Sequence, residues 1–128
     1  MMPTQEELNE ILAKHKKWRN GEEGGERADL QGSDFRGAYL RGADFRGSDL
    51  EGADLENKKL TGKYHHIVNI GSENGTLEMY EVEEDCGWII RRGCFTGSKQ
   101  DFLDKVDETH GNNEHGVKYK KIIELFCD

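Results

Sequence analysis

The chain has 128 residues, 34% of them charged and 34% hydrophobic, so its supply of apolar side chains for a core is small. Its net charge of −8 disfavours direct binding to nucleic acid, because contacts to phosphate groups need a positive surface. No segment has the length and apolarity of a membrane-spanning helix, and no basic and then apolar signal opens the chain, so we expect a cytoplasmic protein of a bacterial host cell with no membrane contact.

Residues 1–27 predict a capping helix followed by a linker. Thr4 and Glu7 have the spacing of a capping box, and Leu8, Ile11, Leu12 and His15 recur at helical spacing. Asn20-Gly21 ends the predicted helix of residues 4–20. A β-structure built from repeats exposes its interior at both ends, and this helix has a suitable size to cover the first end.

Residues 28–62 repeat every five residues. The first unit is Ala28-Asp29-Leu30-Gln31-Gly32, and the last, Lys58–Gly62, has lost the small first residue. The third position of every unit is Leu or Phe, which gives the inward set Leu30, Phe35, Leu40, Phe45, Leu50, Leu55 and Leu60. A period of five is neither helical nor strand-like, so the pattern predicts a coil in which each unit turns a corner.

This pattern resembles the pentapeptide-repeat family, whose consensus is Ala-Asp/Asn-Leu-X-X. The resemblance implies a short right-handed quadrilateral β-helix with four units per coil. Residues twenty apart then stack, so Leu30 is expected next to Leu50, Phe35 next to Leu55, and Leu40 next to Leu60. Because a charge is not tolerated at the small inward site, Lys58 is expected to end the coil. A Gly-rich disordered linker is the alternative, but a linker has no reason to keep Leu or Phe in phase seven times.

Residues 63–128 predict an α+β module, and with the repeats they make the chain mainly β. Turn signals divide three stretches that are rich in strand-forming residues, and two helical patterns follow them. The predicted elements are an antiparallel three-stranded meander of residues 64–70, 76–83 and 87–95, a helix that opens at Ser98 with Asp101, and a last helix at 115–126. This order looks like the tail module on some phage- and prophage-type pentapeptide-repeat proteins.

The sequence shows no motif for catalysis, a cofactor or a metal. A phosphate loop would need Gly-Lys-Ser/Thr, which is absent, and the repeat glycines are better explained as coil corners. The cysteines and histidines lack zinc-ligand spacing, although a tertiary site or a nucleophilic Cys–His pair stays open as an alternative. The residues concerned are His65, His66, Cys86, Cys94, His110, His115 and Cys127.

Two groups of acidic residues are the candidate partner-binding site. The first occupies the position before the apolar residue of the repeats and consists of Asp29, Asp34, Asp44, Asp49 and Asp54. The second is the run Glu78, Glu81, Glu83, Glu84 and Asp85, in the part of the chain that carries most of the net charge. A solvated surface with mixed charges is the alternative interpretation of the repeat aspartates.

We therefore expect a non-enzymatic acidic binding protein, encoded by a phage. It would inhibit a bacterial nucleic-acid-binding or antiphage defence protein, such as a CRISPR effector, by occupying a basic surface. Some members of the family resemble duplex DNA and occupy the DNA groove of topoisomerases, but under two coils with a net charge of −2 make a poor duplex mimic. The alternative is a structural adaptor or dimerisation scaffold. A homodimer through the C-terminal module is also expected, because the apolar supply is small and a second sheet face is left uncovered, and because the module carries the aromatic residues Trp88, Phe95 and Phe126.

Overall fold

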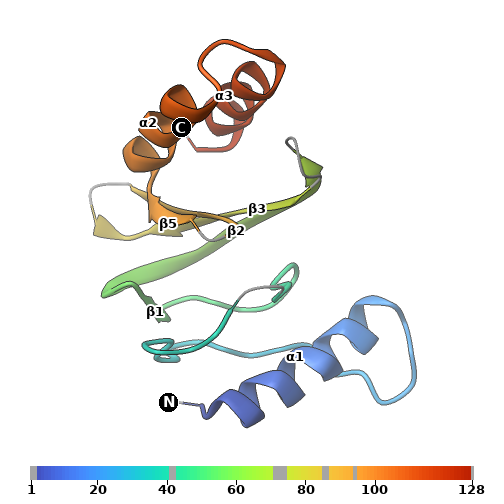
Figure 1. Ribbon diagram of the computed structural model, residues 1–128. Coiled ribbons are helices and arrows are strands. Elements are labelled where there is room, and N and C mark those ends of the chain that lie inside the picture. The colour runs from blue at the N-terminus through green and yellow to red at the C-terminus, as the bar shows by residue number, and fades with distance from the viewer. Residues whose placement is uncertain (1–2, 41–42, 71–74, 85–86, 94, 128) are drawn as a thin grey trace. The chain divides into compact units, whose positions relative to one another are not determined.

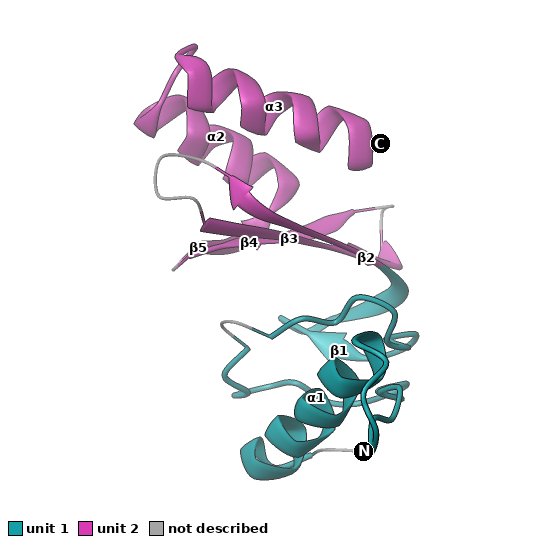
Figure 2. Cartoon of the chain, turned by 90° about the vertical axis from the view of Figure 1, so that its right-hand side faces the viewer, with its two compact units in different colours: residues 1–63 teal, residues 64–128 magenta. Residues whose placement is uncertain are grey.

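The computed structural model of the chain describes residues 3–40, 43–70, 75–84, 87–93 and 95–127. The chain divides into two compact units, residues 1–63 and 64–128, which are coloured separately in Figure 2. The described residues form a mainly β fold with three helices, and the strands are hydrogen-bonded in the order β1-β2-β3-β4-β5 (Figure 1). Among the described residues, no helix has the length and apolarity needed to cross a membrane.

Helix α1 spans Gln5–Arg19, within one residue of the prediction at each end. The capping box is confirmed, because the Thr4 hydroxyl accepts the Glu7 N–H at 3.1 Å and the Glu7 carboxylate accepts the Thr4 N–H at 3.0 Å. Leu8 and His15 are the buried residues of the helix.

Side chains of α1 bind the backbone of the repeats. The Gln5 amide accepts the Tyr39 N–H at 2.8 Å and donates to the Tyr39 carbonyl at 3.1 Å, as a neighbouring strand would. The His15 ring accepts the Ala28 N–H on Nδ1 at 3.1 Å and lies 2.7 Å from the Arg46 carbonyl through Nε2, so Nε2 carries the proton and the ring is neutral. The helix therefore covers backbone groups that the repeats would otherwise expose.

The first, second, fourth and fifth units turn their corners through a four-residue turn that ends at the next unit. The Ser33 N–H donates to the Leu30 carbonyl at 3.1 Å, and the equivalent bond from Ala38 to Phe35 is 3.0 Å. The closing glycine has a positive φ, for example 67° at Gly32 and 75° at Gly37, which is the conformation that the third residue of a type II turn requires. Glycine is favoured there because it has no Cβ.

The predicted stacking is observed for the first two pairs of units. Asp29 pairs with Asp49, and Asp34 with Asp54, through parallel bridges twenty residues apart. The seven inward residues predicted from the sequence are all buried, with at most 5% of each exposed.

The seventh unit reverses direction instead of continuing the coil. Glu56 and Asn57 both have positive φ values, 52° and 61°, which defines a two-residue hairpin turn. β1 (Asp54–Leu55) therefore pairs antiparallel with the start of β2 (Lys58–Ile70). The Leu60 N–H donates to the Ala53 carbonyl at 2.8 Å, so the expected parallel stacking of Leu60 on Leu40 is wrong.

The second unit contains one more strand than predicted. The C-terminal part of β2, from Tyr64, belongs to this unit. It is followed by β3 (Gly75–Val82), β4 (Trp88–Arg92) and β5 (Phe95–Ser98). The strand predicted at residues 87–95 is split at Gly93, whose φ of 59° favours a turn, so the predicted three-stranded meander was incomplete. Helices α2 (Lys99–Thr109) and α3 (Glu114–Phe126) follow as predicted, and α2 begins with the expected Ser98–Asp101 capping box.

The core of the second unit lies between the sheet and the two helices. Leu77, Met79, Trp88 and Ile90 project from the strands toward apolar residues of the helices. The helix residues of this core are Phe102, Val106, Tyr119 and Ile123.

The predicted apolar dimer surface is not present as expected. Trp88 is buried in the core, and the Phe95 ring lies 5.6 Å from that of Phe102, so of the three aromatic residues only Phe126 is exposed, at 38%. On the other face of the sheet, Tyr80 and Ile89 are also buried rather than open to solvent.

Candidate partner-binding surface

The repeat aspartates have a local structural role. The Asp34 and Asp44 carboxylates accept the backbone N–H groups of Arg36 and Arg46, two residues further on, at 2.9 and 3.0 Å. Asp29 and Asp49 make the equivalent bonds at 3.2 Å each. These bonds close Asx turns that reinforce the corners of the coil. The sequence alone did not indicate this role.

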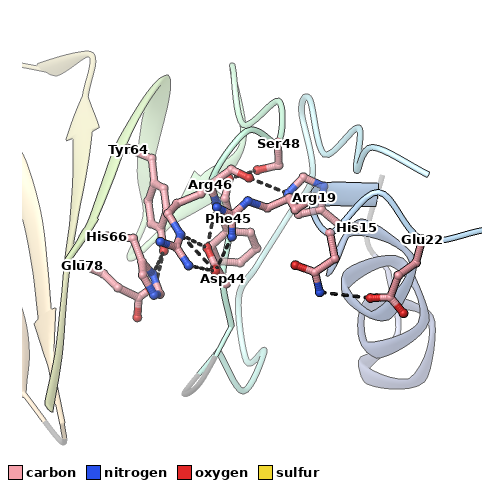
Figure 3. Close-up of polar contacts among 11 residues, drawn as sticks. His15, Arg19, Glu22, Asp44, Phe45, Arg46, Ser48, Tyr64, His66 and Glu78 are labelled. Carbon is pink, nitrogen blue, oxygen red and sulfur yellow. Dashed lines mark hydrogen bonds and ion pairs between the residues drawn. The ribbon is translucent and has the colours of Figure 1, made fainter. Parts of the chain in front are cut away.

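Arginine neutralises the aspartates of the second and fourth units. The guanidinium of Arg36 donates to Asp34 in a two-pronged contact, with Nε 2.8 Å from Oδ2. Figure 3 shows Asp44 held in the same way by Arg46, with a further bond of 2.9 Å from Arg19 of α1. Asp34 and Asp44 therefore contribute little net charge to the surface.

Protonation of Asp34 is coupled to stability. The hydrogen bonds from the Arg36 side chain, and then the bond from its backbone N–H, hold the pKa of Asp34 below its ordinary value of 3.8. The charged carboxylate of Asp34 therefore contributes its full stabilisation when the pH is above the ordinary pKa. This stabilisation is lost as the pH falls through the lowered pKa of the folded state.

We expect the stability advantage of the parent over an Asp34→Asn variant to shrink with acidification. Asparagine keeps an oxygen acceptor for the Arg36 N–H but cannot form the ion pair. The difference in the free energy of unfolding, measured by urea denaturation from about pH 7 to about pH 2, should be steady near neutrality and decrease below about pH 4. A difference that does not change with pH would show that this ion pair does not stabilise the fold.

The first and fifth units form the acidic face of the repeats. Their fourth residues are Gln31 and Glu51, whereas the second and fourth units have Arg36 and Arg46 at this position. The parallel bridge places Asp49 beside Asp29, and the Gly32 N–H donates to the Glu51 carbonyl at 3.0 Å. Asp29, Asp49 and Glu51 are thus brought together, although Glu51 was not among the site residues predicted from the sequence. We call these three residues the repeat acidic face.

Asp54 belongs to a mixed environment. It is half-buried, pairs with Asp34 through the second bridge, and its charge helps to raise the pKa of Arg36, after the larger effect of Asp34. Its carboxylate therefore lies among compensating charges rather than on the repeat acidic face.

Glu78, which the sequence predicts as a partner-binding residue, is buried rather than exposed. Only 7% of its side chain is exposed. One carboxylate oxygen accepts the hydroxyls of Tyr64 and Tyr80 at 2.7 and 2.9 Å, and the other accepts Arg91 at 3.3 Å. Figure 3 shows Tyr64, His66 and Glu78, and the Tyr64 hydroxyl also lies 2.7 Å from His66 Nδ1. Burial, and then the charge of Glu78, raises the pKa of Tyr80 well above its ordinary value.

The rest of the acidic run is divided by the end of β3. Glu81 is half-buried within the strand, whereas Glu83 and Glu84 follow the strand and are exposed. Asp85 lies outside the described residues. Glu83 and Glu84 are therefore the clearest accessible members of the predicted run.

The histidines and the one cysteine that the structure describes do not converge on a metal site. His65 stacks on Trp88 with ring centroids 5.7 Å apart, while His110 and His115 lie 5.5 Å apart at the turn between α2 and α3. Cys127 is buried, and Cys86 and Cys94 lie outside the described residues. In the described part of the chain, no three metal-ligating side chains form a group that could hold an ion.

Comparison with known proteins identifies the repeats. Residues 26–62 match the family model of pentapeptide repeats in eight copies. Residues 26–62 are therefore pentapeptide repeats, in agreement with their turns and their twenty-residue stacking. No curated protein and no solved structure matches the chain.

Proposed function

We propose that the chain is a non-enzymatic acidic binding protein, encoded by a phage and acting in the cytoplasm of the bacterial host cell. It inhibits a bacterial nucleic-acid-binding or antiphage defence protein, such as a CRISPR effector, by occupying a basic surface. The observation that supports this proposal is the concentration of accessible acidic residues at two places, the repeat acidic face and the pair Glu83 and Glu84.

The coil explains why one face is acidic. We infer a right-handed quadrilateral coil, since a twenty-residue offset between bridged residues corresponds to four units of five. Units that are four apart then share a face, so the first and fifth units combine their acids while Arg36 offsets those of the second and sixth.

The two aspartate carboxylates of this face are held in place before a partner binds. The Asx bonds of Asp29 and Asp49 to the N–H groups of Gln31 and Glu51 restrict both side chains. A fixed carboxylate loses less rotamer entropy on binding than a free one, and an array of fixed charges favours a basic surface over neutral ones.

Charge reversal tests the proposal. The partner is first captured from bacterial lysate on the immobilised chain, identified by mass and purified. We expect a Glu83→Lys, Glu84→Lys variant to bind this purified partner at least tenfold more weakly, mostly through slower association. Because both side chains are exposed, the fold should be unchanged.

A second variant neutralises the repeat acidic face through Asp29→Asn, Asp49→Asn and Glu51→Gln. It keeps the oxygen acceptors of the turns and should also weaken binding.

The matched control is Glu10→Lys with Glu23→Lys. Both residues are exposed and precede the repeats. The change in net charge equals that of the Glu83 and Glu84 variant. The control should bind like the parent. If all three variants bind the purified partner as tightly as the parent does, the acidic-inhibitor proposal is wrong.

An adaptor or dimerisation scaffold is the second candidate, and the exposure of Leu125 and Phe126 at the end of α3 favours it. These side chains are 76% and 38% exposed. An adaptor that uses them would lose its partner on Leu125→Ser substitution and would be insensitive to the charge reversals. Trp88 cannot serve in this test, because its replacement would disturb the core.

A further inference from the structure

β5 is the last strand of the sheet, and hydrogen bonding fixes which of its backbone groups face its partner β4. The Val82 N–H donates to the Gly87 carbonyl at 2.9 Å, just beyond the pairing of β3 with β4. Bonded and non-bonded pairs alternate along antiparallel strands. The backbone groups of Ile89 and Arg91 therefore face β3, while those of Ile90 and Arg92 face β5.

The same alternation leaves the backbone groups of Thr96 on the outer edge. Ile90 is paired with Gly97, and Arg92 with Phe95, so the residue between them, Thr96, directs its N–H and C=O away from β4. Ser98 supports this assignment independently, because its N–H donates to the Asp101 carboxylate at 3.4 Å. Thr96 is exposed, and the described part of the chain offers its backbone groups no hydrogen bond.

This edge lacks the features that usually prevent strands from pairing. Edge strands are commonly protected by Lys, Pro or a bulge. β5 has the sequence Phe-Thr-Gly-Ser, with neither a charge nor a proline, and it pairs with β4 without a bulge.

We propose that β5 pairs with β5 of a second copy of the chain, antiparallel and with the two-fold axis at Thr96. The N–H of each Thr96 then donates to the Thr96 carbonyl of the other copy, so one symmetric contact satisfies all four exposed groups. Phe95 lies opposite Gly97 of the other copy, which has no side chain to obstruct the aromatic ring. This pairing is independent of whether the acidic residues inhibit a partner.

A second copy suits this edge better than an unrelated extended peptide. Only one residue of β5 presents outward backbone groups between Phe95 and the helix cap at Ser98, which is a short edge for a foreign strand. An identical strand matches it in length and register. The contact also places no charge opposite a like charge, although each copy has a net charge of −8.

Amide exchange of the unmodified protein tests the pairing directly. Between about 20 µM and about 1 mM protein, exchange of the Thr96 amide should slow at least tenfold as dimers form, whereas the Gly97 amide, already bonded to Ile90, should change less. Light scattering should report a rise toward twice the monomer mass over the same range. A Thr96 amide that exchanges at the same rate at both concentrations would overturn the proposal.

Substitutions at Thr96 separate this edge from other surfaces. Thr96→Ala keeps the N–H and should dimerise like the parent, whereas Thr96→Pro removes the donor and should remain a monomer. If the proline variant fails to fold, Thr96→Lys preserves the backbone but places two ammonium groups together at the axis, and should weaken dimerisation at least tenfold. Dimerisation of a folded Thr96→Pro variant with the affinity of the parent would place the interface elsewhere.

Discussion

Replacing Glu78 by Leu should lower the free energy of unfolding of the second unit by about 3–5 kcal/mol, the usual effect of removing one partner of a buried ion pair. The change leaves the largely buried Arg91 guanidinium without its carboxylate, and the hydroxyls of Tyr64 and Tyr80 without their acceptor. Urea denaturation followed by Trp88 fluorescence in a Trp18→Phe background would measure the effect, because Trp88 is then the remaining tryptophan and lies in the core of this unit.

A paired substitution is the control for this result. Glu78→Leu combined with Arg91→Leu removes both charges and should recover part of the lost stability, because no isolated charge remains buried. A loss below about 1 kcal/mol for Glu78→Leu alone would mean that the carboxylate is solvated.

Phe45→Ala should lower the free energy of unfolding of the compact unit of residues 1–63 by about 3–5 kcal/mol. Phe45 is only 1% exposed, and its ring lies 5.9 Å from that of Phe35 inside the coil. Alanine would leave a cavity that the turns on either side cannot close. The measurement is urea denaturation followed by Trp18 fluorescence, since Trp18 packs near Gly47 in the same unit.

Tyr39→Ala provides the comparison for Phe45→Ala. Tyr39 precedes an inward leucine, its side chain is 66% exposed, and its bonds to Gln5 use backbone atoms only. We expect a change within about 0.5 kcal/mol, as for other surface substitutions. If the two substitutions have equal effects, Phe45 does not belong to the core of the coil.

The repeats were predictable because a period of five leaves few ways to bury one large residue per unit. That argument placed Phe45 and its six counterparts inside. The twenty-residue spacing that pairs Asp29 with Asp49 was implied by the resemblance to the pentapeptide-repeat family. The end of the coil was expected at Lys58 because of its charge, but the hairpin turn that ends it was not predicted. It depends on the positive φ of Glu56, a residue type that gives no strong signal for a hairpin turn.

The candidate site was predictable only in part, because a charge on a strand says little about which face of the sheet it occupies. Glu78 was included in the acidic run as a candidate partner-binding residue, but its face of the strand carries Tyr80 and Arg91, which bind it. Glu83 and Glu84 lie beyond the strand and remain exposed. The structural use of Asp34 and Asp44 depends on backbone N–H positions, which a residue pattern does not show.

The salt dependence of association with the purified partner is the most direct test of acidic recognition. We predict that the association rate constant falls at least tenfold between about 0.05 and about 0.5 M salt, while the dissociation rate constant changes much less, because salt screens long-range attraction between the carboxylates and a basic surface. The Glu83→Lys, Glu84→Lys variant should have a lower rate at low salt and a weaker dependence on salt. An association rate that is independent of salt, and equal for the parent and this variant, would contradict acidic recognition.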